Sequence, residues 1–465
     1  MKNKKFKILF ITFAPHKSFQ AQIGALSAFL KDEGHEVYHV EIIVFTGDSF
    51  NKFQKDVEDA VMHFSPDFVA FSSYDMNYYF IVECARFIKK FRPAVKIIVG
   101  GHHASMAPED YLSLPYFDFL CLGDGEYVFR DLLNSFDIPQ KIHSISGLVY
   151  IDEKGQIVRN LPREPIANLN SLPFVDRTID MSIVSNRLLG DYLPMLVGRG
   201  CPFNCTYCAN ESMRNLYVNK RNYVRKRDPE IVIEEIKHCK KVYKFSFIVF
   251  LDDIFTFDVA WLEKFCYLYK QHFPDLPFHC LLRPELALDT AKLKMLYDAG
   301  CRNVKIGVES GSENYRRRVL KRMTANKVIL KAAKLIKQNK LELHIFLMVG
   351  LPEETFLDML KTLWLNLRIG ADAVQTAIFY PFKNTPLYFY CKDRKLLDEE
   401  KRKKVVVYTF DTTLNYPWFK RILVIAFKWI NSSVPIFRRF KLIYIPLYLR
   451  TQFKKLKKKS IDFNW

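Results

Sequence analysis

Cysteine is scarce in this chain, with ten residues among 465. That scarcity excludes the small disulfide-rich class of secreted proteins. A convincing export signal is missing as well. The short apolar run in "MKNKKFKILFITFAPHKS" ends at Pro15 without a small-residue cleavage site, so it indicates a first buried strand. No repeat of solenoid period is present. We therefore expect a cytoplasmic protein whose thiols stay reduced.

Acidic residues are few at the C-terminal end. The formal charge is +20, and from Lys420 to Trp465 twelve Lys or Arg stand against one acid, Asp462. The longest uncharged run there is nine residues, far short of the ~20 that a membrane-spanning helix needs. Pro435 and Pro446 are expected to interrupt any long helix.

The C-terminal bases are interleaved with aromatic and aliphatic residues, a composition typical of interfacial segments. It predicts peripheral contact with the inner face of the membrane. Nucleic acid is the less favoured partner, because the aromatics lie among aliphatic runs rather than isolated as stacking platforms. A helical lid packed on the preceding domain, with a solvated tip, is the remaining alternative.

Residues 1–140 alternate strand and helix patterns. Five short apolar strands are predicted at 7–13, 35–42, 67–73, 96–101 and 117–123. Strands separated by helices imply a mostly parallel sheet covered on both faces, of Rossmann-like or flavodoxin-like type. Residues 141–190, rich in Pro and Asn, are predicted to be a linker.

A second alternating series occupies residues 191–390. Its strands are predicted at 194–200, 245–253, 277–283, 303–310, 343–352 and 373–380. Six strand–helix units predict a partial (β/α)6 barrel whose chemistry lies at the carboxyl ends of the strands. The fold class is therefore α/β with two domains, followed by a basic helical extension at 391–465.

Three cysteines gather in "RGCPFNCTYCA" (199–209), directly after the first barrel strand: Cys201, Cys205 and Cys208. Three thiolates would ligate three irons of a cubane cluster and leave the fourth open. A zinc site would need a distant fourth ligand. The seven other cysteines lie in apolar patterns and are expected to be buried and inert, namely Cys84, Cys121, Cys239, Cys266, Cys280, Cys301 and Cys391.

This spacing, with Tyr207 before the last cysteine, resembles the signature of the radical S-adenosylmethionine (SAM) superfamily. The resemblance implies a 4Fe-4S cluster whose open iron binds the amino and carboxylate groups of SAM. It further implies cleavage of SAM to a 5′-deoxyadenosyl radical, with the electron coming from a donor such as flavodoxin or ferredoxin.

Further segments resemble SAM-binding stretches at successive strand ends: "FLDD" (250–253), "GVESGSE" (307–313) and "VGLPEET" (349–355). The first departs from the family pattern, which usually contains glycine and glutamate. A zwitterionic cofactor needs carboxylates for its ammonium group and a cation for its carboxylate. Helix capping is the alternative role for each acid. The residues assigned to SAM are Asp252, Asp253, Arg283, Glu309, Ser310, Gly350 and Pro352.

Residues 99–133, "VGGHHASMAPEDYLSLPYFDFLCLGDGEYVFRDLL", are similar to the cobalamin-binding domain that precedes the barrel in one radical SAM subfamily. The glycine pair after a strand would let backbone approach a large planar ligand. No D-x-H-x-x-G pattern occurs, so the resemblance implies cobalt held without a protein histidine. A Rossmann-like domain without ligand is the alternative, and His16 is expected to be a loop or capping residue. The residues assigned to cobalamin are Gly100, Gly101, His102, Gly123, Gly125 and Glu126.

The two resemblances together imply a cobalamin-dependent radical SAM enzyme. Its implied reaction is methylation of an unactivated carbon on a lipid-like or other small molecule, with no catalytic side chain assigned. A cyclase, or an oxidative or rearranging enzyme without a methylating cobalamin, is the second hypothesis. A cobalamin sensor or nucleic-acid adaptor without enzymatic activity is the third.

Overall fold

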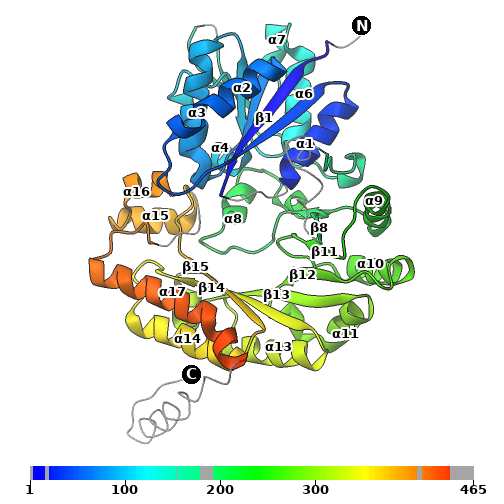
Figure 1. Ribbon diagram of the computed structural model, residues 1–465, viewed down its shortest axis with the longest axis vertical. Helices are drawn as coiled ribbons and strands as arrows, with labels where there is room; N and C mark the ends of the chain where they lie inside the picture. Colours follow the sequence, from blue (N-terminus) through cyan, green and yellow to red (C-terminus); the bar gives the residue numbers. More distant parts are fainter. Residues whose placement is uncertain (1–3, 16–19, 153, 179–191, 406–410, 440–465) are drawn as a thin grey trace, which may run out of the picture. The chain divides into compact units, whose positions relative to one another are not determined.

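The computed structural model describes residues 4–15, 20–152, 154–178, 192–405 and 411–439 (Figure 1). They fall into two compact units. The first contains residues 1–255, 380–409 and 413–415, and the second contains the rest. His16 and most of the basic C-terminal segment lie outside the described residues.

A seven-stranded sheet forms the N-terminal part of the first unit, in the order β2-β1-β3-β4-β5-β6-β7. The five predicted strands are confirmed, and they pair in parallel. Two further strands, β6 and β7, add antiparallel to β5 and lie within the stretch we predicted as a linker. The strands are β1 Lys7–Ala14, β2 Glu36–Ile43, β3 Phe68–Ser72, β4 Lys96–Gly100, β5 Phe119–Cys121, β6 Leu148–Ile151 and β7 Ile157–Arg159.

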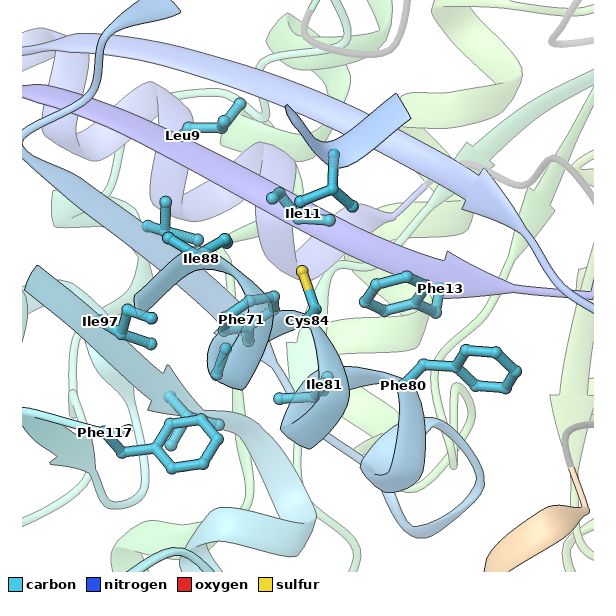
Figure 2. Packing of buried hydrophobic residues seen from close by; sticks show 14 of the residues in the cluster. Leu9, Ile11, Phe13, Phe71, Phe80, Ile81, Cys84, Ile88, Ile97 and Phe117 are labelled. Carbon is cyan, nitrogen blue, oxygen red and sulfur yellow. The ribbon is translucent and has the colours of Figure 1, made fainter. Parts of the chain in front are cut away.

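Both faces of this sheet are buried, as the apolar strands require. Leu9, Ile11 and Phe13 of β1 point into one core, which Figure 2 shows with Cys84 at its centre. The alternate residues Ile8 and Phe10 point into the core on the other face. This alternation follows from the two-residue period of a strand, and helices from the same unit cover each side.

The helices of the first unit begin and end as follows: α1 Ala21–Asp32, α2 Gln54–Phe64, α3 Tyr78–Phe91, α4 Gly101–Met106, α5 Glu109–Leu112, α6 Gly125–Ser135, α7 Pro139–Ile142, α8 Ala209–Arg214, α9 Pro229–Val242, α15 Pro386–Asp393 and α16 Glu399–Lys404. Side chains of α2 and α3 lie in the core of Leu9, and those of α1 and α6 lie in the core of Ile8.

The first unit also holds the first two strands of the second series. β8 (Tyr192–Met195) pairs in parallel with β11 (Phe247–Phe250). A short antiparallel pair, β9 (Gly198–Arg199) with β10 (Arg225–Lys226), flanks the segment that contains the cysteine loop.

The second unit contains four parallel strands paired in sequence order: β12 Phe278–Leu282, β13 Cys301–Glu309, β14 Glu342–Val349 and β15 Ala373–Ile378. With β8 and β11 they complete the six predicted strands. The helices of this unit are α10 Val259–His272, α11 Thr290–Asp298, α12 Glu313–Arg318, α13 Asn326–Gln338, α14 Phe356–Ile369 and α17 Trp418–Arg439.

Helix α17 corrects one expectation, because Pro435 lies inside it and does not end it. Proline lacks the N–H that would bond the carbonyl four residues earlier, which belongs to Asn431. That carbonyl instead accepts a 3.0 Å hydrogen bond from the Asn366 side chain of α14. The helix therefore continues because a tertiary partner replaces the missing donor.

The seven cysteines outside the loop are all buried, as expected. Burial raises the pKa of the Cys84 thiol well above its usual value, which keeps it protonated and unreactive. Among the described residues no helix is long and apolar enough to cross a membrane.

Candidate functional site

The cysteine loop is held in shape from both sides. The Cys208 N–H donates to the Cys205 carbonyl at 3.1 Å, which closes a tight turn. The Arg214 guanidinium donates to the Pro202 carbonyl at 2.6 Å, and the Leu387 N–H donates to the carbonyl of Thr206 at 2.9 Å. The backbone of the loop is thus fixed by residues of α8 and α15.

The three thiols of the loop differ in exposure. Cys205 is buried, whereas Cys201 and Cys208 are half-buried, and Tyr207 is half-buried beside them. A cubane distributes its thiolates over separate irons, so three thiols on one loop can each ligate a different iron, whereas a structural zinc ion needs four ligands.

Burial raises the pKa of Cys208 to about 12, and the nearby charge of Asp253 acts in the same direction. A free thiol here would stay protonated at neutral pH. Metal binding removes such protons outright, because a thiolate is the ligand form. Without a metal, the environment of Cys208 therefore disfavours a reactive thiolate.

Asp252 and Asp253 follow β11 but face different surroundings. Asp252 is buried and accepts the N–H groups of Gly198 and, at 3.3 Å, Val197. Burial raises its pKa to about 6. It ties the end of β11 to the strand before the cysteine loop, so its contacts are those of a structural residue.

Asp253, by contrast, is exposed and stands beside the cysteine loop. It accepts a 2.9 Å hydrogen bond from the side chain of Asn210, which also points toward the Cys208 sulfur at 3.8 Å. Asn210 in turn accepts from the Tyr223 hydroxyl at 2.9 Å. Of the two predicted acids, Asp253 is the one whose carboxylate is available to a ligand near the thiols.

A cavity of about 440 Å³ lies within the first unit, in the usual size range of ligand pockets. One wall comes from the carboxyl ends of β1, β3 and β4, including Thr12, Ser73 and Gly100. The opposite wall comes from the β9–β10 segment and from Asp253. Parallel sheets bind ligands at this edge, and here the edge faces the segment that carries the three cysteines.

The second glycine of the pair in this wall is required by the protein's own packing. Gly101 has a φ of +89°, and a Cβ there would lie 2.6 Å from the Ser73 carbonyl oxygen. A Cβ on Gly100 would meet the Cys121 carbonyl oxygen at 3.4 Å. We expected these glycines to admit a planar ligand. The contacts show that Gly101 leaves room for the backbone of Ser73, whereas Gly100 makes only an ordinary van der Waals contact.

His102 is the one histidine among the described residues that line the cavity. Burial within the protein lowers its pKa, against the opposing charge of Asp253, so the imidazole is neutral near pH 7. Its side chain is accessible from the cavity.

The "GDGE" turn carries a charge cluster that the sequence analysis missed. Asp124 pairs with Arg199 at 3.1 Å and with Arg225 at 2.7 Å, and the buried Glu126 pairs with Arg199 at 2.5 Å. Burial opposes ionisation of Asp124, but the two guanidinium groups outweigh it and hold its pKa below the usual value. Glu126 therefore holds Arg199 by an ion pair. The sequence signal that could have indicated this pair is the presence of opposite charges in "GDGE" and "GRG".

The two glycines of that turn are close-packed. Gly123 has a φ of +77°, and a Cβ there would meet the Tyr217 hydroxyl at 2.5 Å. Its N–H donates to Ser105 at 3.0 Å. Gly125 begins α6, where a Cβ would approach Leu26 at 3.2 Å. The turn thus fixes one corner of the cavity.

A second charge cluster surrounds His103, the residue after His102, and was also missed. His103 lies between Asp75 and Asp110, contacting the latter at 2.8 Å. Lys383 pairs with Asp110, and Arg402 contacts Asp75 at 3.1 Å. Burial opposes ionisation, but the imidazole and ammonium partners lower the pKa of Asp110 to about 2. Residues more than 270 positions apart in the chain are joined in this way.

The remaining predicted residues belong to the second unit. Glu309 ends β13 at a register shift with a φ of +67°, and its carboxylate lies 3.6 Å from Arg322. A bulge of this kind re-aims a side chain at a strand end. Arg283 pairs with Glu285 at 3.1 Å. Ser310 is fully buried and near Thr362, so its contacts are internal.

Gly350 and Pro352 form a closed turn after β14. The Gly350 N–H donates to the buried Glu354 at 2.8 Å, and the Pro352 carbonyl accepts from Tyr315 at 2.6 Å. A Cβ on Gly350 would lie 2.8 Å from a methyl group of Val424 in α17. The turn therefore packs closely against α17.

Comparison with known proteins matches both halves of the chain. The family model for the radical SAM superfamily matches residues 195–363, and that for the B12 binding domain matches residues 17–133. An uncharacterized methyltransferase of Pyrococcus horikoshii is 25% identical over 456 residues, which cover 96% of this chain and 93% of that protein. An anaerobic magnesium-protoporphyrin IX monomethyl ester cyclase of Rubrivivax gelatinosus is 24% identical over 85% of this chain and 70% of its own.

Among solved structures, the radical SAM methyltransferase TsrM from Kitasatospora setae, with cobalamin and a 4Fe-4S cluster bound, matches with a TM-score of 0.65 at 16% identity. The match covers 84% of this chain and 78% of that one. It confirms the predicted fold class, an N-terminal cobalamin-binding type of α/β domain followed by a partial parallel barrel.

Proposed function

We propose that this chain, which belongs to the radical SAM superfamily and carries a B12-binding domain, is a cobalamin-dependent methyltransferase of a lipid-like substrate. The observation that carries the proposal is the shared cavity, because one wall belongs to the B12-binding sheet and the other to the segment leading into the cysteine loop. Methyltransferases among the relatives support the same reaction class.

The cofactors of the enzyme are a 4Fe-4S cluster, SAM and cobalamin. When bound, the cluster supplies the electron that cleaves SAM, and cobalamin supplies a methyl group. Cys201, Cys205 and Cys208 would hold the cluster, since their thiols lie on one fixed loop and form no disulfide. A one-electron donor such as flavodoxin or ferredoxin would reduce it.

Cobalamin would occupy the cavity of the first unit. The loop from Gly100 to His102 and the turn from Gly123 to Glu126 form its walls. Their shape is preset by packing at Gly101 and Gly123, where a positive φ and contacts under 3.0 Å disfavour an added Cβ. His102 would contact the ligand as a neutral imidazole. The role of Glu126 is to keep Arg199 in place, so it acts through that residue.

Carboxylates at the strand ends would orient SAM. Asp253 is linked through Asn210 to the cysteine loop, and it would receive the ammonium group of a SAM molecule bound at the cluster. Glu309, which lies close to Arg322, and the Gly350–Pro352 turn are the further residues that we assign to SAM binding. Asp252 and Ser310 instead support these contacts from buried positions.

A cyclase is the second candidate function, because magnesium-protoporphyrin ester cyclases match most of this chain. SAM carrying an isotopically labelled methyl group separates the two reactions. A methyltransferase places the label in the product, whereas a cyclase forms a ring without it. Label in the product under turnover conditions would exclude the cyclase.

The proposal is tested on anaerobically reconstituted protein by iron content and visible spectrum with added hydroxocobalamin. The Cys201→Ala/Cys205→Ala/Cys208→Ala variant should lose its iron and keep cobalamin. Cys239→Ala, a buried cysteine outside the loop, is the matched control and should keep both. Iron retained by the triple variant, or no cobalamin in any of the proteins, would contradict the proposal.

A further inference from the structure

Helix α17 is the longest helix of the second unit, and one side of it is buried. Val424 and Phe427 pack against Val349, Met359 and Ile378 of β14, α14 and β15. Figure 1 shows α17 in orange-red alongside α14 and β15 of the same unit. These contacts fix which side of the helix faces outward.

The outward side of α17 is also apolar. Trp418 is 73% exposed, Ile422 57%, and Trp429 52%. We call this side the α17 outer face, and its residues are Trp418, Phe419, Ile422, Trp429, Ile430, Ile436 and Phe437. At 3.6 residues per turn these positions fall on one broad stripe opposite Val424 and Phe427. A globular helix normally carries polar residues there, so exposed apolar side chains of this number indicate a binding surface.

The charges on α17 are of one sign. The sequence of the helix, "WFKRILVIAFKWINSSVPIFRR", contains five bases and no acid. Arg438 and Arg439 are exposed at its C-terminal end, and Lys428 lies 5.4 Å from the ring centre of Trp429. Arg421 pairs with Asp411. The apolar stripe is thus bordered by positive charge.

We propose that the α17 outer face binds the surface of an anionic lipid membrane, with the helix lying parallel to it. Aliphatic side chains would enter the boundary between headgroups and acyl chains, tryptophans would sit at the headgroup level, and the bases would meet lipid phosphates. The bases exclude a spanning orientation and complement the negative surface.

Binding at this face would bring the enzyme to substrates dissolved in the membrane. That consequence rests on the proposed lipid-like substrate, whereas membrane binding itself does not depend on the catalytic function. A vesicle assay without turnover therefore tests the surface separately.

The test is co-sedimentation of the full-length holoenzyme with vesicles of phosphatidylcholine alone or with phosphatidylglycerol added. We expect binding to the anionic vesicles only, reduced by high salt, with a blue shift of tryptophan emission. Trp418→Ser/Ile422→Ser/Trp429→Ser should lower the bound fraction by at least about tenfold, since it removes the centre of the apolar stripe. Tyr267→Ser, on a 64% exposed residue of α10, is the matched control.

Each outcome decides the proposal. Equal binding of the triple variant and the control, or no binding of the unmodified protein to anionic vesicles, would overturn it. If the unmodified protein does not bind vesicles but forms a dimer, and the triple variant is a monomer, the α17 outer face would instead bind a second copy of the chain. Retained iron and cobalamin in the triple variant would show that its fold is intact.

Discussion

The buried carboxyl of Glu354 predicts how stability depends on pH at the turn after β14. Glu354 is 1% exposed, and one of its oxygens accepts the N–H groups of Gly350 at 2.8 Å and Leu351 at 3.2 Å. Its other oxygen is buried and has no hydrogen-bond partner among the described residues. Burial raises the pKa of Glu354 from 4.5 to about 8, despite the two N–H groups and Lys420.

The sign follows from the raised pKa. Between pH 4.5 and about 8 the folded state holds a proton that the unfolded state has lost, so stability falls as the pH rises through this window. At ~1.4 kcal/mol per pH unit, the difference between 4.5 and about 8 corresponds to roughly 5 kcal/mol. Most of that loss is complete at pH 8.

Glu354→Gln mimics the protonated carboxyl and keeps an oxygen for the two N–H groups. We expect it to match the unmodified protein near pH 4.5 and to exceed its stability by several kcal/mol at pH 8. The assay is urea unfolding of the two proteins across this pH range. Glu353→Gln, on the exposed neighbouring side chain, is the control and should keep the unmodified pH slope. An unchanged slope in Glu354→Gln, or lower stability than the unmodified protein at pH 8, would refute the reasoning.

Three further predictions concern the cavity and the cysteine loop. Gly101→Ala should lower the free energy of unfolding in urea by at least about 2 kcal/mol and reduce the cobalamin content, because it adds a backbone clash to a left-handed conformation. Gly155→Ala is the control. It also has a positive φ but has open space around it, so it should lower the free energy of unfolding by only about 1 kcal/mol. Arg199→Met should destabilise by about 3–5 kcal/mol because it leaves Glu126 buried without its partner, and adding Glu126→Gln should recover part of that loss in the same assay. Asp253→Asn should lower SAM affinity about tenfold in equilibrium dialysis while leaving iron content unchanged, since it removes one charge-assisted contact.

The order of strands and the cysteine loop could be predicted from the sequence because their signals are local. Apolar runs of strand length, separated by helix-length segments, locate all eleven predicted strands. The cysteine spacing needs only eight consecutive residues. Strand β7 escaped prediction because Ile157 and Arg159 lie exposed on a short edge, so no apolar alternation marks it. Strand β6 is apolar and buried, but it spans only four residues inside a stretch that is otherwise rich in Pro and Asn.

The roles of individual polar residues depended on burial and on distant partners. Asp252 and Asp253 are neighbours in the sequence, yet one accepts backbone N–H groups in the interior and the other stands exposed beside the thiols. Sequence order cannot distinguish the roles of these two acids, because their surroundings depend on how the end of β11 lies next to β9 in the folded chain. Glu126 of the "GDGE" turn likewise pairs with Arg199 only in the folded chain.

By itself, then, the sequence determined the α/β class, the alternation of strands and the three-thiol loop, since each rests on periodicity or spacing within a short segment. Only the tertiary structure decided that Pro435 stays helical, because its replacement donor, Asn366, lies 69 positions earlier in the chain. The tertiary structure also decided which side of α17 is buried, and so which apolar residues remain exposed. Both were beyond sequence reasoning for the same reason, which is that hydrogen bonds and burial are satisfied by whichever groups the fold brings together.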